Sequence, residues 1–312
     1  MNNCNKTVIL TQASSLYPDL LRHIHNPPRK IFYRGDMEIF NKISVAFVGT
    51  RKFTPYGELV VDSLVSDLSL CDVVIVSGLA RGIDTLAHEA AIKYGLKTAA
   101  ILGTGVNNIY PSENKELAEE IIAKGGCVLS EYPDDLPVKN FNFPMRNRII
   151  AGLSVATVVV EAPESSGALI TAKVAIEEGR DVFAVPGDID RLQSLGCNNL
   201  IKSSAAKPCL SGTDIIAELK IQPSFIREKH SLHGSNHAEN PQISFLDQSS
   251  KKVLETLSVT RPMSTEQIIK LANLPLRDAQ KALSLLELNE LIYSTLGGLY
   301  LKKKRNNITK SL

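Results

Sequence analysis

The block VKNFNFPMRNRIIAGLS, at residues 138–154, places basic and aromatic side chains close together. Such a combination binds single-stranded nucleic acid, because the bases stack on aromatic rings while cations follow the phosphates. The candidate residues are Lys139, Phe141, Phe143, Arg146 and Arg148. We expect one phenylalanine to be buried and one exposed. We favour Phe143 for stacking because Pro144 stiffens the chain beside the arginines.

The two arginines of this block are not expected to share one role. Residues two apart on a helix do not lie on the same face, so one of Arg146 and Arg148 is expected to form a structural salt bridge. The candidate partners are Glu131 and Glu161.

Small residues follow five of the apolar segments that we interpret as strands. The loops are GTRKFTPYG (49–57), SGLARGID (77–84), GTGVNNIYP (103–111), SEYPDDLP (130–137) and ESSGALIT (164–171). Exposed backbone N–H groups and helix N-termini bind phosphate, and several such loops along one edge suit a polyanion better than one compact ligand. For any single loop, the alternative is that glycine only permits a tight turn.

The candidate phosphate-cradle positions are Gly49, Thr50, Ser77, Gly78, Ser165, Ser166 and Gly167. Arg51 directly follows the first of the apolar segments, and its planar guanidinium group matches the geometry of phosphate oxygens. We therefore expect Arg51 to bind a phosphate at the ligand edge of the sheet.

Other residue patterns suggest enzymatic chemistry but lack an essential part. GTGVNN is not a dinucleotide fingerprint, because Asn108 stands where the third glycine lets helix and strand pack closely. Glu131 could still bind a ribose, so a nicotinamide site stays a minor alternative. Asp84 and His88 could form a metal or acid–base pair, but capping and local hydrogen bonds explain them better without a third ligand. We expect no catalytic residue, no cofactor and no metal.

The elements that position these residues follow from apolar runs that alternate with amphipathic segments. Strands are expected at 44–49, 73–77, 98–102, 127–130, 156–162 and 181–185, and helices at 56–70, 82–94, 113–124, 145–152 and 167–179. Continuous apolar runs are typical of strands covered on both faces. The pattern predicts an α/β fold with a Rossmann-like, doubly wound, mostly parallel sheet.

Composition divides the chain into five parts. We expect an N-terminal lead-in at 1–42, a Rossmann-like domain that binds single-stranded DNA at 43–221, a polar linker at 222–244, a winged-helix domain at 245–302 and a basic tail at 303–312. In the winged helix, Ser264 is the expected N-cap of the second helix and Gly297-Gly298 the turn of the hairpin. The segment KKKRNNITKSL carries five basic residues and no acid, which leaves 30 of the 35 basic residues against 33 acidic ones elsewhere. Any binding site for nucleic acid in the body of the protein is therefore a local positive patch.

Cysteine usage favours a cytoplasmic protein. The five cysteines are scattered and form no CxxC pair, as expected of free, buried thiols in a reducing compartment. No signal peptide and no membrane span are expected.

Seven ordered motifs resemble one known family. They are GTRKFTPYG (49–57), SGLARGIDTLAHEAA (77–91), LGTGVNNIYPSEN (102–114), SEYP (130–133), FPMRNRIIAGLS (143–154), VVEAPESSGALITA (159–172) and AVPGDIDRLQSLGCNNLI (184–201). Together they are similar to the DNA-processing family DprA/Smf over residues 8 to 220.

The resemblance implies a protein that binds single-stranded DNA in natural transformation, protects it and helps load the RecA recombinase, without catalysis. It also implies a homodimer formed through the Rossmann-like domain. The DNA-binding positions that it suggests are Arg51, Gly103, Lys139, Phe143, Arg146 and Arg148.

A related sheet occurs in nucleotide-processing hydrolases of the lysine-decarboxylase-like group, whose loop reads PGGxGTxxE. This is the alternative function. The corresponding stretch here, at residues 163–167, reads PESSG and continues ALITAK. It has no carboxylate three residues past a Gly-Thr pair, so the catalytic acid of that group is missing.

Overall fold

The computed structural model describes residues 6–134, 136, 139–222, 247–258, 262–289, 291–294 and 299–303. The chain divides into two compact units, Met1–Phe225 and Ile226–Leu312. Each has a hydrophobic core of its own. We refer to them as the Rossmann-like unit and the C-terminal unit.

In the described part of the Rossmann-like unit, strands form one sheet in the order β1-β2-β6-β5-β4-β3-β7-β8-β9. The seven strands from β6 to β9 in this order are parallel, whereas β1 and β2 extend the sheet with antiparallel pairs. The strands are β1 (Val8–Thr11), β2 (Lys30–Gly35), β3 (Ile43–Val48), β4 (Val73–Ser77), β5 (Lys97–Leu102), β6 (Cys127–Ser130), β7 (Ala156–Val159), β8 (Asp181–Ala184) and β9 (Lys207–Pro208). The prediction of a doubly wound, mostly parallel sheet is confirmed.

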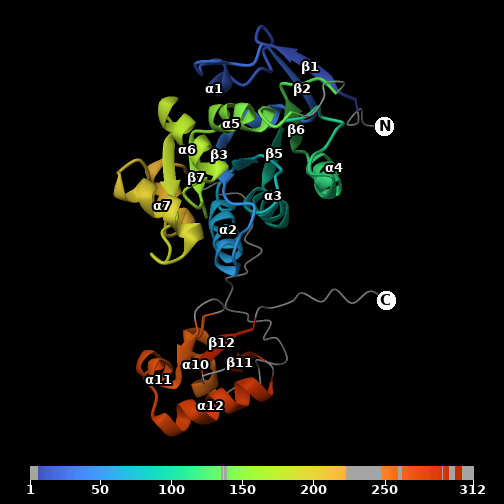
Figure 1. Ribbon diagram of the computed structural model, residues 1–312. Helices are drawn as coiled ribbons and strands as arrows, with labels where there is room; N and C mark the ends of the chain where they lie inside the picture. Colours follow the sequence, from blue (N-terminus) through green and yellow to red (C-terminus); the bar gives the residue numbers. More distant parts are fainter. Residues whose placement is uncertain are drawn as a thin grey trace, which may run out of the picture. The chain divides into compact units, whose positions relative to one another are not determined.

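Helices cover both faces of this sheet (Figure 1). They are α1 (Asp19–Arg22), α2 (Pro55–Leu68), α3 (Ile83–Lys93), α4 (Lys115–Ala123), α5 (Asn142–Gly152), α6 (Gly167–Glu177), α7 (Leu192–Lys202) and α8 (Gly212–Glu218). Successive residues of a strand point to opposite faces, so β3 supplies both cores. Val45 and Phe47 pack with α2 and α3, and Ala46 and Val48 pack with α5 and α6.

The lead-in predicted at residues 1–42 contributes strands to the main sheet. Strand β2 pairs with β6, with Phe32 opposite Ser130, and β1 pairs with β2. Tyr17 is buried between them and α5, and its hydroxyl donates to the carbonyl oxygen of Pro28 at 2.8 Å. The segment is thus part of the Rossmann-like unit.

Helix α5 begins at Asn142, three residues before the predicted start at residue 145. Pro144 lies in its first turn, where the missing N–H group has no partner within the helix. Because the helix starts early, Phe143 and Arg146 are three residues apart on it and share a face. This face turns toward the carboxyl ends of the strands.

The described part of the C-terminal unit contains α10 (Gln248–Thr256), α11 (Thr265–Ala272), α12 (Leu276–Leu288) and a sheet of β10 (Met263–Ser264), β12 (Leu299–Lys302) and β11 (Ile292–Ser294). Ser264 caps α11 as predicted, and Gln267 completes a capping box. The core includes Val253, Ile268 and Leu286. The expected turn at Gly297-Gly298 and the linker at 223–244 lie outside the described residues, and the winged-helix assignment stays a prediction.

Four cysteines confirm the expectation of buried free thiols: Cys71, Cys127, Cys197 and Cys209. Cys4 lies outside the described residues. Within the described part of the chain, no helix combines the length and the apolar character that crossing a membrane requires.

Candidate nucleic-acid interface

A pocket of about 560 Å³ lies at the carboxyl ends of the central strands. The chain builds outward from β3 through β4, β5 and β6 and then returns to place β7 on the other side of β3, so strands β3 and β7 form a topological switch point. Open α/β sheets bind ligands in the crevice at such a point. We call this cavity the switch-point pocket, and it brings together the loop after β3, the start of α6 and the inner face of α5.

The loop after β3 is held by its first two residues and presents the third. Gly49 packs so closely on Ile83 that an added Cβ would lie 2.4 Å from its side chain. Thr50 is buried, and its N–H donates to the carbonyl oxygen of Glu161 at 2.7 Å. Arg51 is exposed at the pocket, and within the described residues it forms no ion pair with an acidic side chain. Its guanidinium is therefore available to an anion.

Glu161 holds the neighbouring helix in place. It is buried, and its carboxylate accepts hydrogen bonds from the N–H of Thr54 at 2.8 Å and from the Thr54 hydroxyl at 2.5 Å. Thr54 is the N-cap of α2, which starts directly after the Arg51 loop. Glu161 is thus tied to the backbone and does not pair with either arginine of α5.

The N-terminus of α6 forms another part of the pocket wall. Ser166 is its N-cap and accepts a hydrogen bond from the N–H of Ala168. Ser165, Ser166 and Gly167 all line the pocket, and the space beside Gly167 is open. The helix macrodipole places partial positive charge at this end. Together with Arg51, this end of α6 offers a site for phosphate.

Arg146 lines the same pocket but is 5% exposed. Its Nη1 donates to the carbonyl oxygens of Gly78, at 2.6 Å, and of Ile101, and its Nε donates to Asn147 Oδ1 at 3.2 Å. Burial lowers the pKa of this guanidinium to about 10, so it stays charged near neutral pH. Its Nη2 makes no hydrogen bond in the described structure and could still serve a ligand. The other donors hold β4 and β5 to α5.

Asp84 lies beside Arg146 and also lines the pocket. Its Oδ2 accepts hydrogen bonds from the N–H groups of Gly78 at 3.1 Å and Ala80 at 3.4 Å. Burial raises the pKa of its carboxyl to about 6, against the opposing effect of Arg146. We call Asp84 and Arg146 the pocket floor.

Ser77 and Gly78 do not offer the phosphate cradle that the sequence suggests. The Ser77 hydroxyl is buried and donates to the carbonyl oxygen of Phe47 at 2.6 Å. The N–H of Gly78 is bonded to Asp84, and an added Cβ would lie 2.4 Å from the Arg146 guanidinium. Both residues serve the packing of the floor instead.

An aromatic pair borders the pocket. Phe143 is half-buried and rests on Gly103, where an added Cβ would lie 2.8 Å from its ring. The Tyr110 ring centroid is 5.5 Å from that of Phe143, with the ring planes tilted by 48°. Both rings line the pocket. Tyr110 is not among the residues predicted from the sequence, although the Tyr-Pro step that ends the GTGVNNIYP loop places an aromatic ring there.

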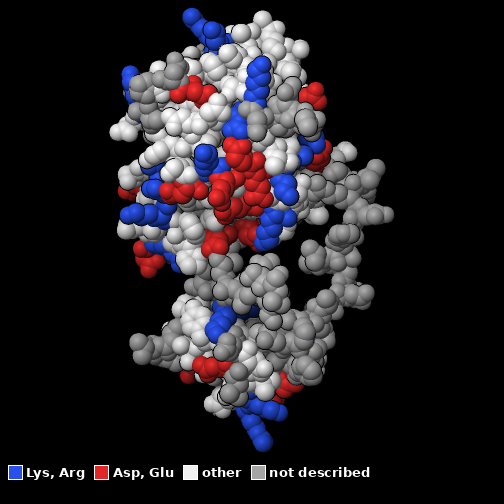
Figure 2. Space-filling model, turned by 90° about the vertical axis from the view of Figure 1, so that its right-hand side faces the viewer, with Lys and Arg blue, Asp and Glu red and all other residues white. Residues whose placement is uncertain are grey.

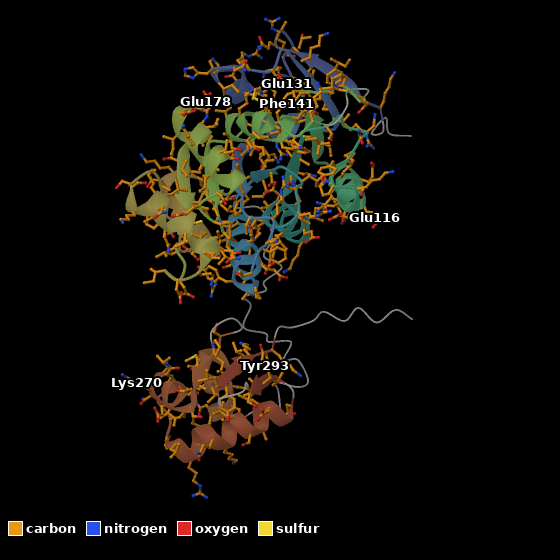
Figure 3. The ribbon with its side chains drawn as sticks, viewed as in Figure 1. Glu116, Glu131, Phe141, Glu178, Lys270 and Tyr293 are labelled. Atoms are coloured by element: carbon orange, nitrogen blue, oxygen red, sulfur yellow. The ribbon has the colours of Figure 1, made fainter. Side chains whose placement is uncertain are left out.

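Phe141 and Lys139 lie outside this pocket. Phe141 is 60% exposed and Phe143 is half-buried, so the more exposed phenylalanine is Phe141 and not Phe143, the ring favoured for stacking. The Lys139 ammonium lies 5.7 Å from the centre of the Phe141 ring. Phe141 is the N-cap residue of α5, and Figure 3 shows it close to that helix. Lys139 and Phe141 thus form a second exposed patch with a basic and an aromatic side chain, separate from the residues that line the switch-point pocket.

Arg148 forms the structural salt bridge that was predicted for one of the two arginines. Its Nη2 donates to both carboxylate oxygens of Glu131, at 2.6 and 2.7 Å, and its side chain is 12% exposed. The structure therefore does not bring Arg148 into the pocket. Of the six positions suggested for DNA, Arg51, Phe143 and Arg146 line the cavity, and Gly103 supports Phe143.

A different face of the Rossmann-like unit is acidic. Figure 2 shows acidic side chains gathered on that face. Helices α2, α3 and α4 each contribute a glutamate to it: Glu58, Glu89 and Glu120. Burial raises the pKa of Glu89, and the negative charges of Glu58 and Glu120 raise it further. These helices cover the face of the sheet opposite α5. A polyanion is disfavoured there, which agrees with the expectation of a local positive patch.

Fold and site together define a Rossmann-like α/β protein with a phosphate- and base-compatible pocket at its switch point. The family model for DNA recombination-mediator protein A matches residues 8–220, so the chain belongs to that family. The recognised resemblance to DprA/Smf is confirmed.

Relatives cover the same part of the chain. DNA processing protein DprA of Streptococcus pneumoniae is 46% identical over 205 residues, which is 65% of this chain and 71% of the relative. The protein of the same name from Bacillus subtilis is 44% identical over 208 residues, covering 66% and 69%.

Two solved structures are also similar. The X-ray structure of DprA from Streptococcus pneumoniae has a TM-score of 0.65 and 43% identity, covering 69% of this chain and 75% of that one. The structure of DNA processing protein A from Helicobacter pylori, described for its single-stranded DNA binding mode, has a TM-score of 0.62 and 29% identity, covering 69% and 96%.

Proposed function

We propose that this chain binds single-stranded DNA at the switch-point pocket. The observation that carries the proposal is the position of Arg51, which is exposed, forms no ion pair within the described residues, and lines the pocket together with a helix N-terminus and two aromatic rings. Phosphate and base are the two parts of a nucleotide that such a site recognises. The Helicobacter pylori relative, described for single-stranded DNA binding, supports the choice of ligand.

The binding is expected to favour single strands and to depend little on sequence. The pocket offers phosphate contacts and stacking surfaces, and sequence is read by contacts to base edges. If about three phosphates are neutralised per protomer, log affinity falls against log salt with a slope of about −2. A titration with single- and double-stranded oligonucleotides of equal length, at several salt concentrations, tests this. Equal or tighter duplex binding would refute the proposal.

We also propose a role in natural transformation, in which the protein protects the incoming strand and helps load the RecA recombinase. Membership of the recombination-mediator family supports this role. The test is RecA filament formation on oligonucleotides coated with single-stranded-DNA-binding protein. Addition of this protein should shorten the lag of filament formation, and an Arg51→Ala variant should not. The buried free thiols support a cytoplasmic location.

The protein is proposed to act without catalysis. The carboxyl group of Asp84, which lines the pocket, and that of Glu161, which holds Thr54, accept hydrogen bonds that fix the surrounding loops. Incubation with nucleoside monophosphates tests the hydrolase alternative. Release of free base, in proportion to protein concentration and absent from an Asp84→Asn variant, would overturn this part of the proposal.

A homodimer is proposed to form through the Rossmann-like unit. Three apolar side chains near the ends of the neighbouring strands β8 and β9 are largely exposed: Ile189 (88%), Leu192 (67%) and Leu210 (77%). Exposed apolar residues in segments that follow neighbouring strands favour a protein interface at this edge of the sheet. Leu192→Lys should shift the protein from dimer to monomer in sedimentation equilibrium. The control is Leu70→Lys, at an apolar position 60% exposed after α2, which should leave the dimer intact.

A further inference from the structure

A small recess adjoins the switch-point pocket on the side of the aromatic pair. Arg51, Tyr110 and Phe143 line both cavities, and the recess adds Arg81. Arg81 belongs to the turn between β4 and α3, and its side chain is 59% exposed. A second cation therefore lies next to the stacking surface.

The guanidinium group of Arg81 is occupied by a carboxylate. Its Nε donates to Glu113 Oε1 and its Nη2 donates to Oε2 at 2.8 Å, so two parallel hydrogen bonds join the groups. The Arg81 hydrogen bond is the main reason that the pKa of Glu113 is lowered. Phosphate oxygens fit the same fork of donors. A phosphate can therefore take the place of the Glu113 carboxylate without moving Arg81.

The segment that carries Glu113 does not depend on this ion pair. Asn114, the next residue, is buried, and its Nδ2 donates to the carbonyl oxygen of Leu79 at 2.9 Å and to Thr85 Oγ1 at 2.8 Å. The ion pair itself is exposed on both sides, and exposed ion pairs contribute little to stability. The Arg81–Glu113 ion pair should therefore affect ligand binding at the recess more than it affects the stability of the fold.

We propose that Arg81 is a second phosphate-binding side chain of the site and that Glu113 competes with the phosphate for it. The inference rests on the proposed function. A base stacked on the pair of Tyr110 and Phe143 brings two flanking phosphates to the recess, one more than Arg51 binds alone. In the free protein Glu113 keeps Arg81 oriented, and in the complex it yields the guanidinium to the strand. Glu113 thereby lowers the affinity and eases release of the strand.

The test is a set of titrations with a fluorescent single-stranded oligonucleotide over a range of salt. Glu113→Gln should tighten binding about threefold, because Arg81 no longer has a charged competitor. The slope of log affinity against log salt should stay near that of the wild type in Glu113→Gln and become shallower by about 0.7 in Arg81→Ala, which loses one phosphate contact. Arg81→Ala should weaken binding. The double variant Arg81→Ala/Glu113→Gln should bind as weakly as Arg81→Ala, because the gain depends on the arginine.

A matched control removes the same charge elsewhere. Asp72 forms an exposed ion pair with Lys42 at 2.8 Å, and neither residue lines the pocket or the recess. Asp72→Asn should leave affinity and salt slope unchanged. Tighter binding by Asp72→Asn, or a gain that persists in the double variant, would overturn the inference in favour of a general charge effect.

The outcome for Arg51→Ala separates the two proposals. If the wild-type protein binds single strands and Arg51→Ala weakens that binding, the proposed site stands, and unchanged or weaker binding by Glu113→Gln refutes only the role of Glu113. If Arg51→Ala binds normally, the site itself is wrong, and the inference falls with it.

Discussion

The loop after β3 and helix α5 both direct an arginine into the same pocket, but the two side chains have different surroundings. Arg51 is exposed and pairs with no acidic side chain in the described structure, whereas Arg146 is buried and bonded to the carbonyl oxygens of Gly78 and Ile101. Residue type and position in a pocket therefore do not fix a role. The number of donors left free decides which arginine binds a ligand and which holds the site together.

Removal of Arg146 should have the largest effect and should appear in stability. Arg146→Ala leaves two buried carbonyl oxygens and Asp84 without the guanidinium, so the free energy of unfolding should fall by about 3 kcal/mol or more. Urea unfolding followed by circular dichroism measures this. Arg148→Ala, which breaks a less buried ion pair, is the comparison and should cost less. Equal losses in the two variants would contradict the structural role of Arg146.

His88 extends the comparison to a second buried basic group. The Thr98 hydroxyl uses its proton to donate to the carbonyl oxygen of Ile75. The N–H at Nδ1 of His88 therefore donates to Thr98 Oγ1, at 2.7 Å. Burial, with a smaller effect of Arg146, lowers the pKa of His88 to about 3. The unfolded state then binds the extra proton from about pH 6.5 downward, so stability should fall with pH by up to about 1.4 kcal/mol per unit.

Asp84 changes the stability with pH in the opposite direction to His88, because the pKa of its carboxyl is about 6 in the folded protein and 3.8 in the unfolded chain. Its contribution to stability is full below pH 3.8 and is lost as pH rises through 6. Urea unfolding of wild type and His88→Gln at pH 7, 6, 5 and 4 isolates the histidine. The variant should lose less stability on acidification. Parallel curves for the two proteins would show that His88 does not titrate as described.

Replacement of Arg51 should have the opposite result to replacement of Arg146: a large effect on DNA binding and a small effect on stability. Arg51→Ala should weaken single-strand affinity about ten- to a hundredfold, as expected for loss of one charge-assisted phosphate contact. The melting temperature should stay near that of the wild type. Lys173→Ala, on the exposed side of α6, removes a positive charge away from the pocket and should bind normally. Unchanged binding by Arg51→Ala would move the site elsewhere on the sheet.

The smallest effect is expected from removing the C-terminal unit and the tail. Residues 1–221 include the whole switch-point pocket and should fold, dimerise and keep most of the single-strand affinity. The basic tail adds a diffuse attraction that salt screens. Affinities of the full and shortened chains should differ modestly at low salt and converge at high salt. A large loss that persists at high salt would make the C-terminal unit a principal binding surface.

The central fold and the position of Arg51 could be predicted because both depend on local sequence. Continuous apolar runs identify the buried parallel strands, and the residue after the first of them must lie at the ligand edge. The burial of Arg146 could not be predicted in this way. Its partners Gly78 and Ile101 are about 70 and 45 residues away, and only the packed sheet brings their carbonyl oxygens together.

Other features were missed because their signals are weak or distant. Tyr110 lies in a loop with no periodicity, and only its contact with Phe143 gives it a place in the site. Helices α7 and α8 follow strands at the end of the sheet, and α8 is short and marked only by the capping box of Ser211 and Asp214. Strand β2 was predicted to belong to a separate N-terminal segment, because its partner β6 comes much later in the chain.

That late partner also affects how the chain emerges during synthesis. Strands β1 and β2 can pair with each other early, but β2 finds β6 only after nearly a hundred further residues, as the pairing of Phe32 with Ser130 requires. At ribosomal rates of about 5–20 residues per second, this delay lasts on the order of 5 to 20 seconds. During that time Ile31, which is fully buried in the finished protein, has no core to enter. A ribosome-bound chaperone therefore has access to the nascent hairpin until β6 has been synthesised.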